Sequence, residues 1–309
     1  MTKKTWRQVD GIVLLNKPIG LSSNQALQKV RRLYQAEKAG HTGALDPLAT
    51  GMLPLCFGEA TKYSQFLLNA DKRYITTIFL GKRTTTGDAE GNILTNEDVP
   101  SIKDSELEVL LERFRGSIEQ IPPMYSALKY EGRPLYEYAR QGIVIERKKR
   151  QVFIRNLSVI ERTHNTLTLD ISCSKGTYIR TIGEDIGEAL GCGAHLQSLH
   201  RVSTAGYKSE DMLTLDKLEE VAEQGFSALD RYLLPIDTAV LHFNKVELTP
   251  LETQDLLYGR TLAKKTSLEV EQLVRIYTQT DNHFLGLGQI KAGAVKPHRL
   301  VNTSRLVRN

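Results

Sequence analysis

The chain has 309 residues, with 41 Lys or Arg against 36 Asp or Glu, and its formal net charge is +5. Hydrophobic residues make up 40% of it and charged residues 25%, a balance that excludes a disordered, collagen-like or fibrous protein. No apolar run approaches the roughly 18 residues of a membrane-spanning helix, so we expect a cytoplasmic protein without membrane contact. The mild basic excess permits a polyanionic partner without requiring one.

Motifs for metals and cofactors are missing from the sequence. The cysteines Cys56, Cys173 and Cys192 are widely scattered and form no C-x-x-C pair, so neither a disulfide framework nor a zinc site is indicated. Neither a Walker loop nor a G-x-G-x-x-G fingerprint occurs. If the protein is an enzyme, we expect its chemistry to come from side chains and substrate alone, without a cofactor or metal.

The beginning of the chain predicts a strand, a turn, a helix and a loop. Residues 11–15 form a β-type apolar run, residues 17–20 form a Lys-Pro turn, and either Ser22 or Ser23 is placed to cap a helix that reaches about Tyr34. Residues 40–51 contain three glycines and a proline with few periodic apolar positions. This composition predicts a loop of unusually small residues.

The middle of the chain mixes strand and helix patterns. Residues 74–80 alternate as a strand does, and residues 105–114 are amphipathic with a helical period. Two β-like runs, 152–160 and 167–173, are separated by a polar turn and predict a hairpin. Residues 176–190 then predict the entry into a further helix.

Beyond Pro235 the composition changes to short strand-like pieces at 245–248, 273–277 and 284–290. After Asp281 the chain has no acidic residue, and its basic residues there are Lys291, Lys296, Arg299, Arg305 and Arg308. We therefore expect a small β-rich appendage with one basic side.

Asp46 is the best candidate for chemistry, because glycines in its loop let the backbone approach a ligand closely. Asp46 followed by Pro47 is also the expected cap and first residue of a helix. Against the cap, Gly51 and Pro54 follow so soon that little helix remains to be capped. Spacing alone leaves both interpretations open.

Several blocks of sequence carry a resemblance that decides between them. GHTGALDPLATGMLPLCFGEATK, at residues 40–62, resembles the signature of the TruB family, bacterial enzymes that make pseudouridine 55 in the T loop of tRNA. DGIVLLNKPIGLSSN, DKRY, RTTTGDAEG, QIPPMYSALKYEGRPLYEYARQG, SCSKGTYIRTIGEDIG and GCGAHLQSLHR continue the family pattern in order. The similarity covers nearly all of residues 10–205 and is looser afterwards. It implies the pseudouridine synthase fold, which is an α+β fold with a mixed, mainly antiparallel sheet and flanking helices, and a small C-terminal PUA-like domain.

The resemblance also implies roles for particular residues. Asp46 matches the catalytic aspartate of the family, Tyr74 the tyrosine that packs against the target base, and Arg180 the arginine that pairs with the aspartate. Tyr178 matches a base-contacting tyrosine. His41 matches the histidine that helps to hold flipped-out T-loop nucleotides.

Three further positions are implied to contact substrate or RNA. Lys17 lies in the Lys-Pro turn of the family, Leu199 matches an active-site leucine, and Arg201 stands in the last matching block. Two positions depart from the family pattern, Thr85 where an aspartate is usual and His200 where arginine is common. Neither departure touches the proposed nucleophile, so both bear on RNA contacts.

These roles agree with the chemistry of pseudouridine formation. The reaction breaks a C–N glycosidic bond and rejoins the base through carbon, so it needs a nucleophile and no redox or phosphoryl cofactor. An ionised carboxylate attacks either the uracil ring or the ribose C1′, and the sequence does not choose between them. Arg180 beside Asp46 would keep the carboxylate charged in a closed pocket. A purely structural ion pair would leave the same sequence.

The resemblance predicts a catalytic domain at 1–236 and a PUA-like RNA-binding domain at 237–309. Residues 122–150, rich in tyrosine and basic residues, suit an inserted thumb that closes over RNA, and a solvated charged hairpin is the plainer interpretation. The expected partner is the T-arm of tRNA, with a monomeric enzyme and no obligatory protein partner. The main rival function is a non-catalytic factor that binds and folds tRNA through the same cleft. A methyltransferase is a weaker rival, because no glycine-rich cofactor loop is present.

Overall fold

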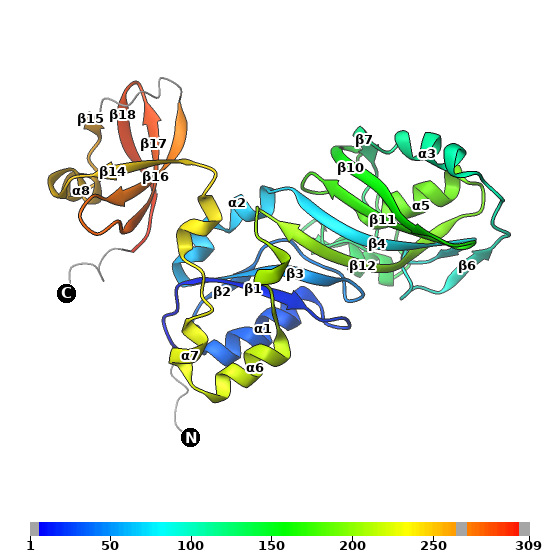
Figure 1. Cartoon of the computed structure of the whole chain (residues 1–309), viewed down its shortest axis with the longest axis horizontal. Coiled ribbons are helices and arrows are strands. Elements are labelled where there is room, and N and C mark those ends of the chain that lie inside the picture. The colour runs from blue at the N-terminus through cyan, green and yellow to red at the C-terminus, as the bar shows by residue number, and fades with distance from the viewer. Residues whose placement is uncertain (1–5, 264–270, 303–309) are drawn as a thin grey trace.

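The structure is a computed structural model that describes residues 6–263 and 271–302. Its strands form a large sheet and a separate smaller one, which lies at the other end of the molecule (Figure 1). None of the helices among the described residues is long and apolar enough to cross a membrane.

Nine strands within residues 6–263 form the large sheet, in the order β13-β1-β3-β12-β4-β11-β10-β7 with β2 paired to β3. In chain order they are β1 (Gly11–Lys17), β2 (Ala39–His41), β3 (Thr50–Phe57), β4 (Lys72–Leu80), β7 (Gly116–Gln120), β10 (Arg150–Arg162), β11 (Thr166–Cys173), β12 (Ala194–Thr204) and β13 (Leu213–Thr214). Among these pairs β1 with β13 and β12 with β3 run parallel, and the others are antiparallel. The predicted mixed, mainly antiparallel sheet is confirmed.

Helices cover the large sheet at both ends (Figure 1). They are α1 (Ser23–Tyr34), α2 (Ser64–Asn69), α3 (Asp104–Glu112), α5 (Ile179–Ala189), α6 (Leu215–Glu223) and α7 (Phe226–Asp230). The sequence explains α1 directly, because Ser22 and Gln25 form a capping box at its start and Leu27 and Val30 are buried on one face. The predicted bounds of α1 and of the 152–173 hairpin are close to those observed.

Strand β3 was not predicted, although it lies near the centre of the sheet. Its Pro54 argues against a strand, because proline cannot donate to a ladder. In the structure Pro54 faces Leu14 of β1 and its carbonyl accepts a hydrogen bond from the Thr42 amide, 3.1 Å away. At this position the strand is therefore held through the Pro54 carbonyl, a detail that local composition does not reveal.

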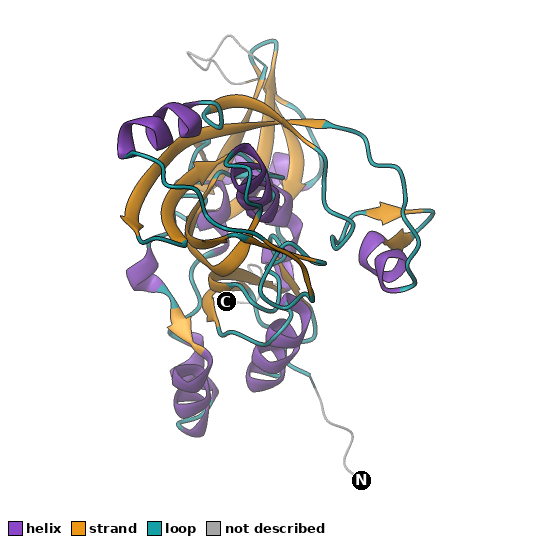
Figure 2. Cartoon of the chain, turned by 90° about the vertical axis from the view of Figure 1, so that its right-hand side faces the viewer, coloured by secondary structure: helices purple, strands orange, loops and turns teal. Residues whose placement is uncertain are grey.

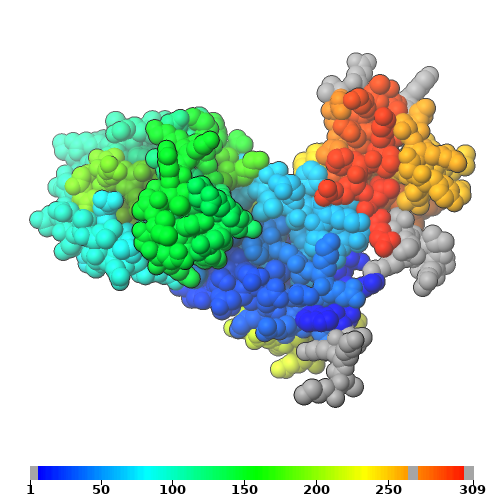
Figure 3. Space-filling view, turned by 180° about the vertical axis from the view of Figure 1, so that it is seen from behind, coloured from blue at the N-terminus to red at the C-terminus, as the bar shows by residue number. Residues whose placement is uncertain are grey.

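An arm inserted between β7 and β10 extends from the body of the sheet. It carries β8 (Lys129–Tyr130), β9 (Arg133–Pro134) and α4 (Leu135–Arg140). Figure 2 shows this hairpin and helix held away from the sheet by long loops, and in Figure 3 the arm forms a green lobe on the surface. A second small hairpin, β5 (Lys82–Thr84) with β6 (Ile93–Asn96), lies beyond β4.

The C-terminal sheet has the order β14-β16-β17-β18-β15 among the described residues. It comprises β14 (Asn244–Leu248), β15 (Leu262–Ala263), β16 (Gln272–Thr278), β17 (Phe284–Lys291) and β18 (Ala294–Leu300), and α8 (Pro250–Leu257) packs beside it. The predicted short strands are confirmed. Of the predicted basic side, Arg305 and Arg308 lie outside the described residues.

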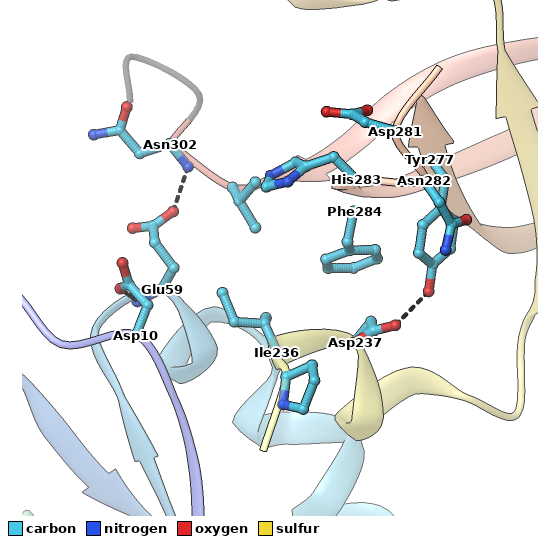
Figure 4. A pocket seen from close by; sticks show the side chains of 12 residues that line it. Asp10, Glu59, Ile236, Asp237, Tyr277, Asp281, Asn282, His283, Phe284 and Asn302 are labelled. Carbon is cyan, nitrogen blue, oxygen red and sulfur yellow. Dashed lines mark hydrogen bonds between the residues drawn. The ribbon is translucent and has the colours of Figure 1, made fainter. Parts of the chain in front are cut away.

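A seam joins this domain to residues 58–63 of the main body. The Tyr63 hydroxyl donates to the Arg299 carbonyl at 2.8 Å, and Arg299 donates to the Lys62 carbonyl at 2.7 Å. Figure 4 shows a cavity along the seam, where the Asn302 amide donates to Glu59 at 2.5 Å. Buried apolar side chains from both domains form one cluster beneath these bonds, so the C-terminal domain is held in a defined orientation.

Candidate active site

The loop between β2 and β3 presents Asp46. No helix begins after Pro47, where residues 47–48 form only a bend, so the interpretation of Asp46 as a helix cap is wrong. Neighbouring segments hold the loop in place instead. The Gly20 amide donates to the Pro47 carbonyl at 2.8 Å, and the Leu45 amide donates to the Ser23 hydroxyl at 2.7 Å.

Arg201 fixes the two ends of this loop from inside the sheet. The side chain is buried, with Nε donating to the Met52 carbonyl at 2.6 Å and Nη2 donating to the Gly43 carbonyl at 3.0 Å. Gly51 crosses directly over the Arg201 backbone at φ +96°, where a Cβ would stand 2.3 Å from the Arg201 carbonyl oxygen. Only glycine fits this crossing.

Arg180 on α5 contacts Asp46 directly. Its Nε lies 3.0 Å from Asp46 Oδ2, while Nη1 donates to the Thr86 carbonyl at 2.9 Å and Nη2 to the Tyr125 carbonyl at 2.6 Å. The Arg180 side chain is only 5% exposed. Its orientation is therefore set by backbone carbonyls as well as by the carboxylate it meets.

Asp88 is a member of this network that the sequence analysis missed. It is buried, its Oδ2 lies 3.5 Å from Arg180 Nη1, and Oδ1 accepts from the Thr86 hydroxyl at 2.5 Å and the Glu90 amide at 3.1 Å. The block RTTTGDAEG contained the residue, but a polar turn is a sufficient explanation for such a sequence. Only the fold brings that turn behind α5.

The surroundings of Asp46 push its pKa in opposite directions. Removal from water raises the pKa of the carboxyl above its ordinary value, Arg180 lowers it, and the Asp88 carboxylate raises it again. The side chain still has 41% of its surface exposed, because one side opens into the cavity. Asp46 is thus walled by protein and accessible to a substrate that enters from that side.

The cavity beside Asp46 has a volume of about 290 Å³ and is lined by residues from distant segments. Tyr74 of β4, Leu199 of β12 and Tyr178 at the start of α5 all line it. The Arg150 guanidinium lies 4.5 Å from the centre of the Tyr178 ring. Flat aromatic faces and cations around one carboxylate suit a nucleobase attached to a charged backbone.

Two of the predicted RNA contacts, Lys17 and His41, are not among the residues that line this cavity. Lys17 is completely buried, with Nζ donating to the Leu21 carbonyl at 2.6 Å and the Pro18 carbonyl at 2.8 Å, and burial lowers its pKa to about 8. His41 lies at the end of β2, and its Nδ1 is buried without a hydrogen-bond partner in the described part of the chain. Burial and the nearby Arg201 lower the pKa of His41, so the imidazole is neutral near pH 7.

Three family models match successive parts of the chain. "TruB family pseudouridylate synthase (N terminal domain)" matches residues 31–179, "tRNA pseudouridylate synthase B C-terminal domain" matches 180–241, and "Pseudouridine synthase II TruB, C-terminal" matches 245–301.

Curated relatives match the chain over almost its whole length. The tRNA pseudouridine synthase B of Marinomonas sp. (strain MWYL1) is 70% identical over 98% of this chain and 99% of its own length. The proteins of the same name from Haemophilus influenzae (strain PittEE) and Yersinia pestis (strain Pestoides F) are 49% and 50% identical, and the matches cover 98% and 99% of this chain and 98% and 97% of theirs.

A crystal structure of a Cbf5-Nop10-Gar1 complex contains a chain of similar fold, with a TM-score of 0.70 and 24% identity over 94% of this chain and 83% of that one. Together the fold and the relatives define a pseudouridine synthase, an isomerase. Within that class, the chain belongs to the TruB family of pseudouridylate synthases.

Proposed function

We propose that the protein converts uridine 55 in the T loop of tRNA to pseudouridine, with Asp46 as nucleophile. The observation that carries the proposal is the Asp46–Arg180 pair, 3.0 Å apart, in a cavity lined by aromatic and cationic side chains. The 70% identity to a tRNA pseudouridine synthase B supports tRNA as the substrate.

In the proposed reaction the bond between N1 of uracil and C1′ of the ribose breaks. The base turns, a bond forms between C5 and C1′, the C5 proton is lost and N1 gains a proton, so the substrate and product are isomers. Asp46 must be ionised to attack either uracil or C1′. Burial raises the pKa of Asp46, and Arg180 opposes that shift by favouring the charged form.

Access to the uridine requires it to leave the folded T loop, at a cost of a few kcal/mol. Tyr74 offers a ring face on which the extruded uracil can stack, worth about 1–3 kcal/mol. Burial raises the pKa of the Tyr74 hydroxyl, which keeps it neutral and favours stacking over a role as general base. We assign Tyr178 and Leu199 to the walls around the base, His41 to the T-loop nucleotides, and Lys17 and Arg201 to the support of the catalytic loop.

We assign catalysis to residues 1–236, with the arm at 122–150 as a thumb over the RNA, and RNA binding to the PUA-like domain at 237–309. The thumb is tied to the site through the Tyr125 carbonyl, which accepts from Arg180. We propose that the enzyme acts in the cytoplasm as a monomer on the T-arm of tRNA.

The product position tests this proposal. Unmodified tRNA transcript is treated with the enzyme, and pseudouridine is located by carbodiimide adducts that stop primer extension. We expect one new stop, one nucleotide to the 3′ side of position 55, and none when uridine 55 is replaced by cytidine. A tRNA that is bound without any new stop would instead support a tRNA-folding factor, and a stop at another position would overturn the assigned substrate site.

A further inference from the structure

Lys72 is a buried cation on the wall of the catalytic cavity. On β4, inward and outward residues alternate, and Lys72, Tyr74 and Thr76 are all buried on the same face. Lys72 is 8% exposed and lines the same cavity as Tyr74 and Asp46. Lysine is almost never buried to this extent without a charged partner.

The protein satisfies the Lys72 ammonium only in part. Nζ donates to the Leu68 carbonyl at 2.9 Å and to the Ala70 carbonyl, both at the end of α2. An ammonium has three donors, and no third acceptor for Nζ is found in the described part of the chain. Nor is an ion pair of Nζ found there, and the adjacent Asp71 carboxylate pairs with Arg155.

A second cation, Arg201, lies close to Lys72. Both side chains approach Gly43, where a Cβ would stand 3.3 Å from Arg201 Nη1 and 3.7 Å from the Lys72 Cε carbon. Arg201 donates to the Met52 and Gly43 carbonyls and forms no ion pair among the described residues. Two positive groups therefore meet beside the catalytic loop without a carboxylate between them, whereas Arg180 has Asp46 and Asp88.

The electrostatics show that this arrangement is costly without a further negative group. Burial, followed by Arg201, lowers the pKa of Lys72 to about 8. Among the other groups that face it, Cys173 and Asp71 raise the pKa and Lys175 lowers it. Because a buried charge is stabilised by an opposite one, an anion that enters the cavity would compensate the pair.

We propose that Lys72 donates its third N–H to a phosphodiester oxygen next to the target uridine, with Arg201 as a second positive charge behind it. This rests on the proposed function, in which that uridine occupies the cavity. Phosphodiesters are the only anionic groups that the RNA would bring, since uracil and ribose are neutral. In this proposal Asp46, Tyr74 and Arg180 face the base, and Lys72 binds the backbone to which the base is attached. All four residues line the cavity.

The test uses T-arm hairpin RNA in which one linkage, 5′ or 3′ to the target uridine, is a neutral methylphosphonate. For the wild type, one of the two linkages should raise KM about 10- to 100-fold, the value of one hydrogen bond to a charged group. Lys72→Gln should show a similar rise on native RNA and little further rise on the methylphosphonate RNA. Lys72→Arg, which keeps the charge, should recover part of the loss.

The matched control is Lys217→Gln, because Lys217 is an exposed lysine of α6 paired with Glu220. The factors by which Lys217→Gln and the neutral linkage change KM should multiply, as they do for two independent changes. The proposal is overturned if both methylphosphonates leave the wild-type KM unchanged, a result that does not depend on any variant folding. It is also overturned if the Lys72→Gln and methylphosphonate effects multiply. Failure of the proposed function looks different, because the wild type would then form no pseudouridine in native hairpin or tRNA.

Discussion

At the scale of single residues, Arg180 connects the parts of the active site. One guanidinium contacts Asp46, the buried Asp88 and the carbonyls of Thr86 and Tyr125. Removal of Asp46 from water favours its neutral acid, and Arg180 opposes this effect. The charge state of the proposed nucleophile is therefore a balance between burial and one neighbouring cation.

That balance predicts the pH dependence of catalysis. Since the ionised carboxylate reacts, kcat should fall at low pH with a midpoint at the pKa of Asp46. Arg180→Gln removes a group that lowers this pKa, so the acidic limb should move to higher pH and kcat should fall by a factor of about 100 or more.

Asp88→Asn should move the acidic limb in the opposite direction, because the Asp88 carboxylate raises the pKa of Asp46. Arg73→Gln is the control, since Arg73 pairs with Asp170 away from the cavity and should leave the limb in place. Profiles of kcat against pH for the wild type and the three variants measure the position of the acidic limb in each protein. An acidic limb that Arg180→Gln leaves unmoved, or moves to lower pH, would contradict the assigned balance.

At the scale of elements, the close pairing of Gly51 of β3 with Arg201 of β12 positions the catalytic loop. Gly51→Ala would force a Cβ to within 2.3 Å of the Arg201 carbonyl at a φ of +96°. The expected loss in free energy of unfolding is roughly 3 kcal/mol or more. Gly20→Ala is a matched control with φ +83° and nothing within 4 Å of the new Cβ, so it should cost only about 1 kcal/mol. Denaturant unfolding measures both, and equal losses would show that the crossing is not tightly packed.

The thumb gives a second prediction at this scale. Residues 147–149 end the loop between α4 and β10, and Lys149 contacts Glu119 at 3.4 Å while Lys148 is exposed. If this segment grips RNA, the double variant Arg147→Gln/Lys148→Gln should weaken binding and reduce the slope of log Kd against log salt by about 1–2. Lys217→Gln/Arg231→Gln, at exposed residues of α6 and at the end of α7, provides a variant with the same charge change elsewhere. A slope that stays at the wild-type value would support the solvated charged hairpin.

The helices and strands differ in how far their local sequence predicts them. Periodic segments such as α1 and the β10–β11 hairpin could be predicted because each follows its own local pattern. Strand β3 could not, because Pro54 is tolerated only through its particular partners. The residues of the Asp46 site could be proposed through family resemblance. Asp88 and Lys72 could not, because burial and the packing of distant segments, rather than a motif, bring them to the site.

At the scale of the whole molecule, the seam fixes how the C-terminal domain faces the main body. Tyr63→Phe keeps the ring in its buried cluster and removes the hydroxyl that donates to the Arg299 carbonyl at 2.8 Å. The free energy of unfolding should fall by about 1 kcal/mol. Tyr258→Phe, at an exposed tyrosine beyond α8, should leave stability unchanged. Calorimetry that finds no difference between the two variants would mean that this bond contributes nothing to the seam.

The central claim is that Asp46 carries out pseudouridine formation, and release of tritium from C5 of labelled uridine in unmodified tRNA tests it most directly. C5 loses its hydrogen only when it becomes the glycosidic carbon. We expect release by the wild type, none by Asp46→Asn, and tRNA binding within a few-fold for both. Asp216→Asn, an exposed carboxylate of α6, should release tritium like the wild type. Release by Asp46→Asn at a rate near that of the wild type would contradict the account.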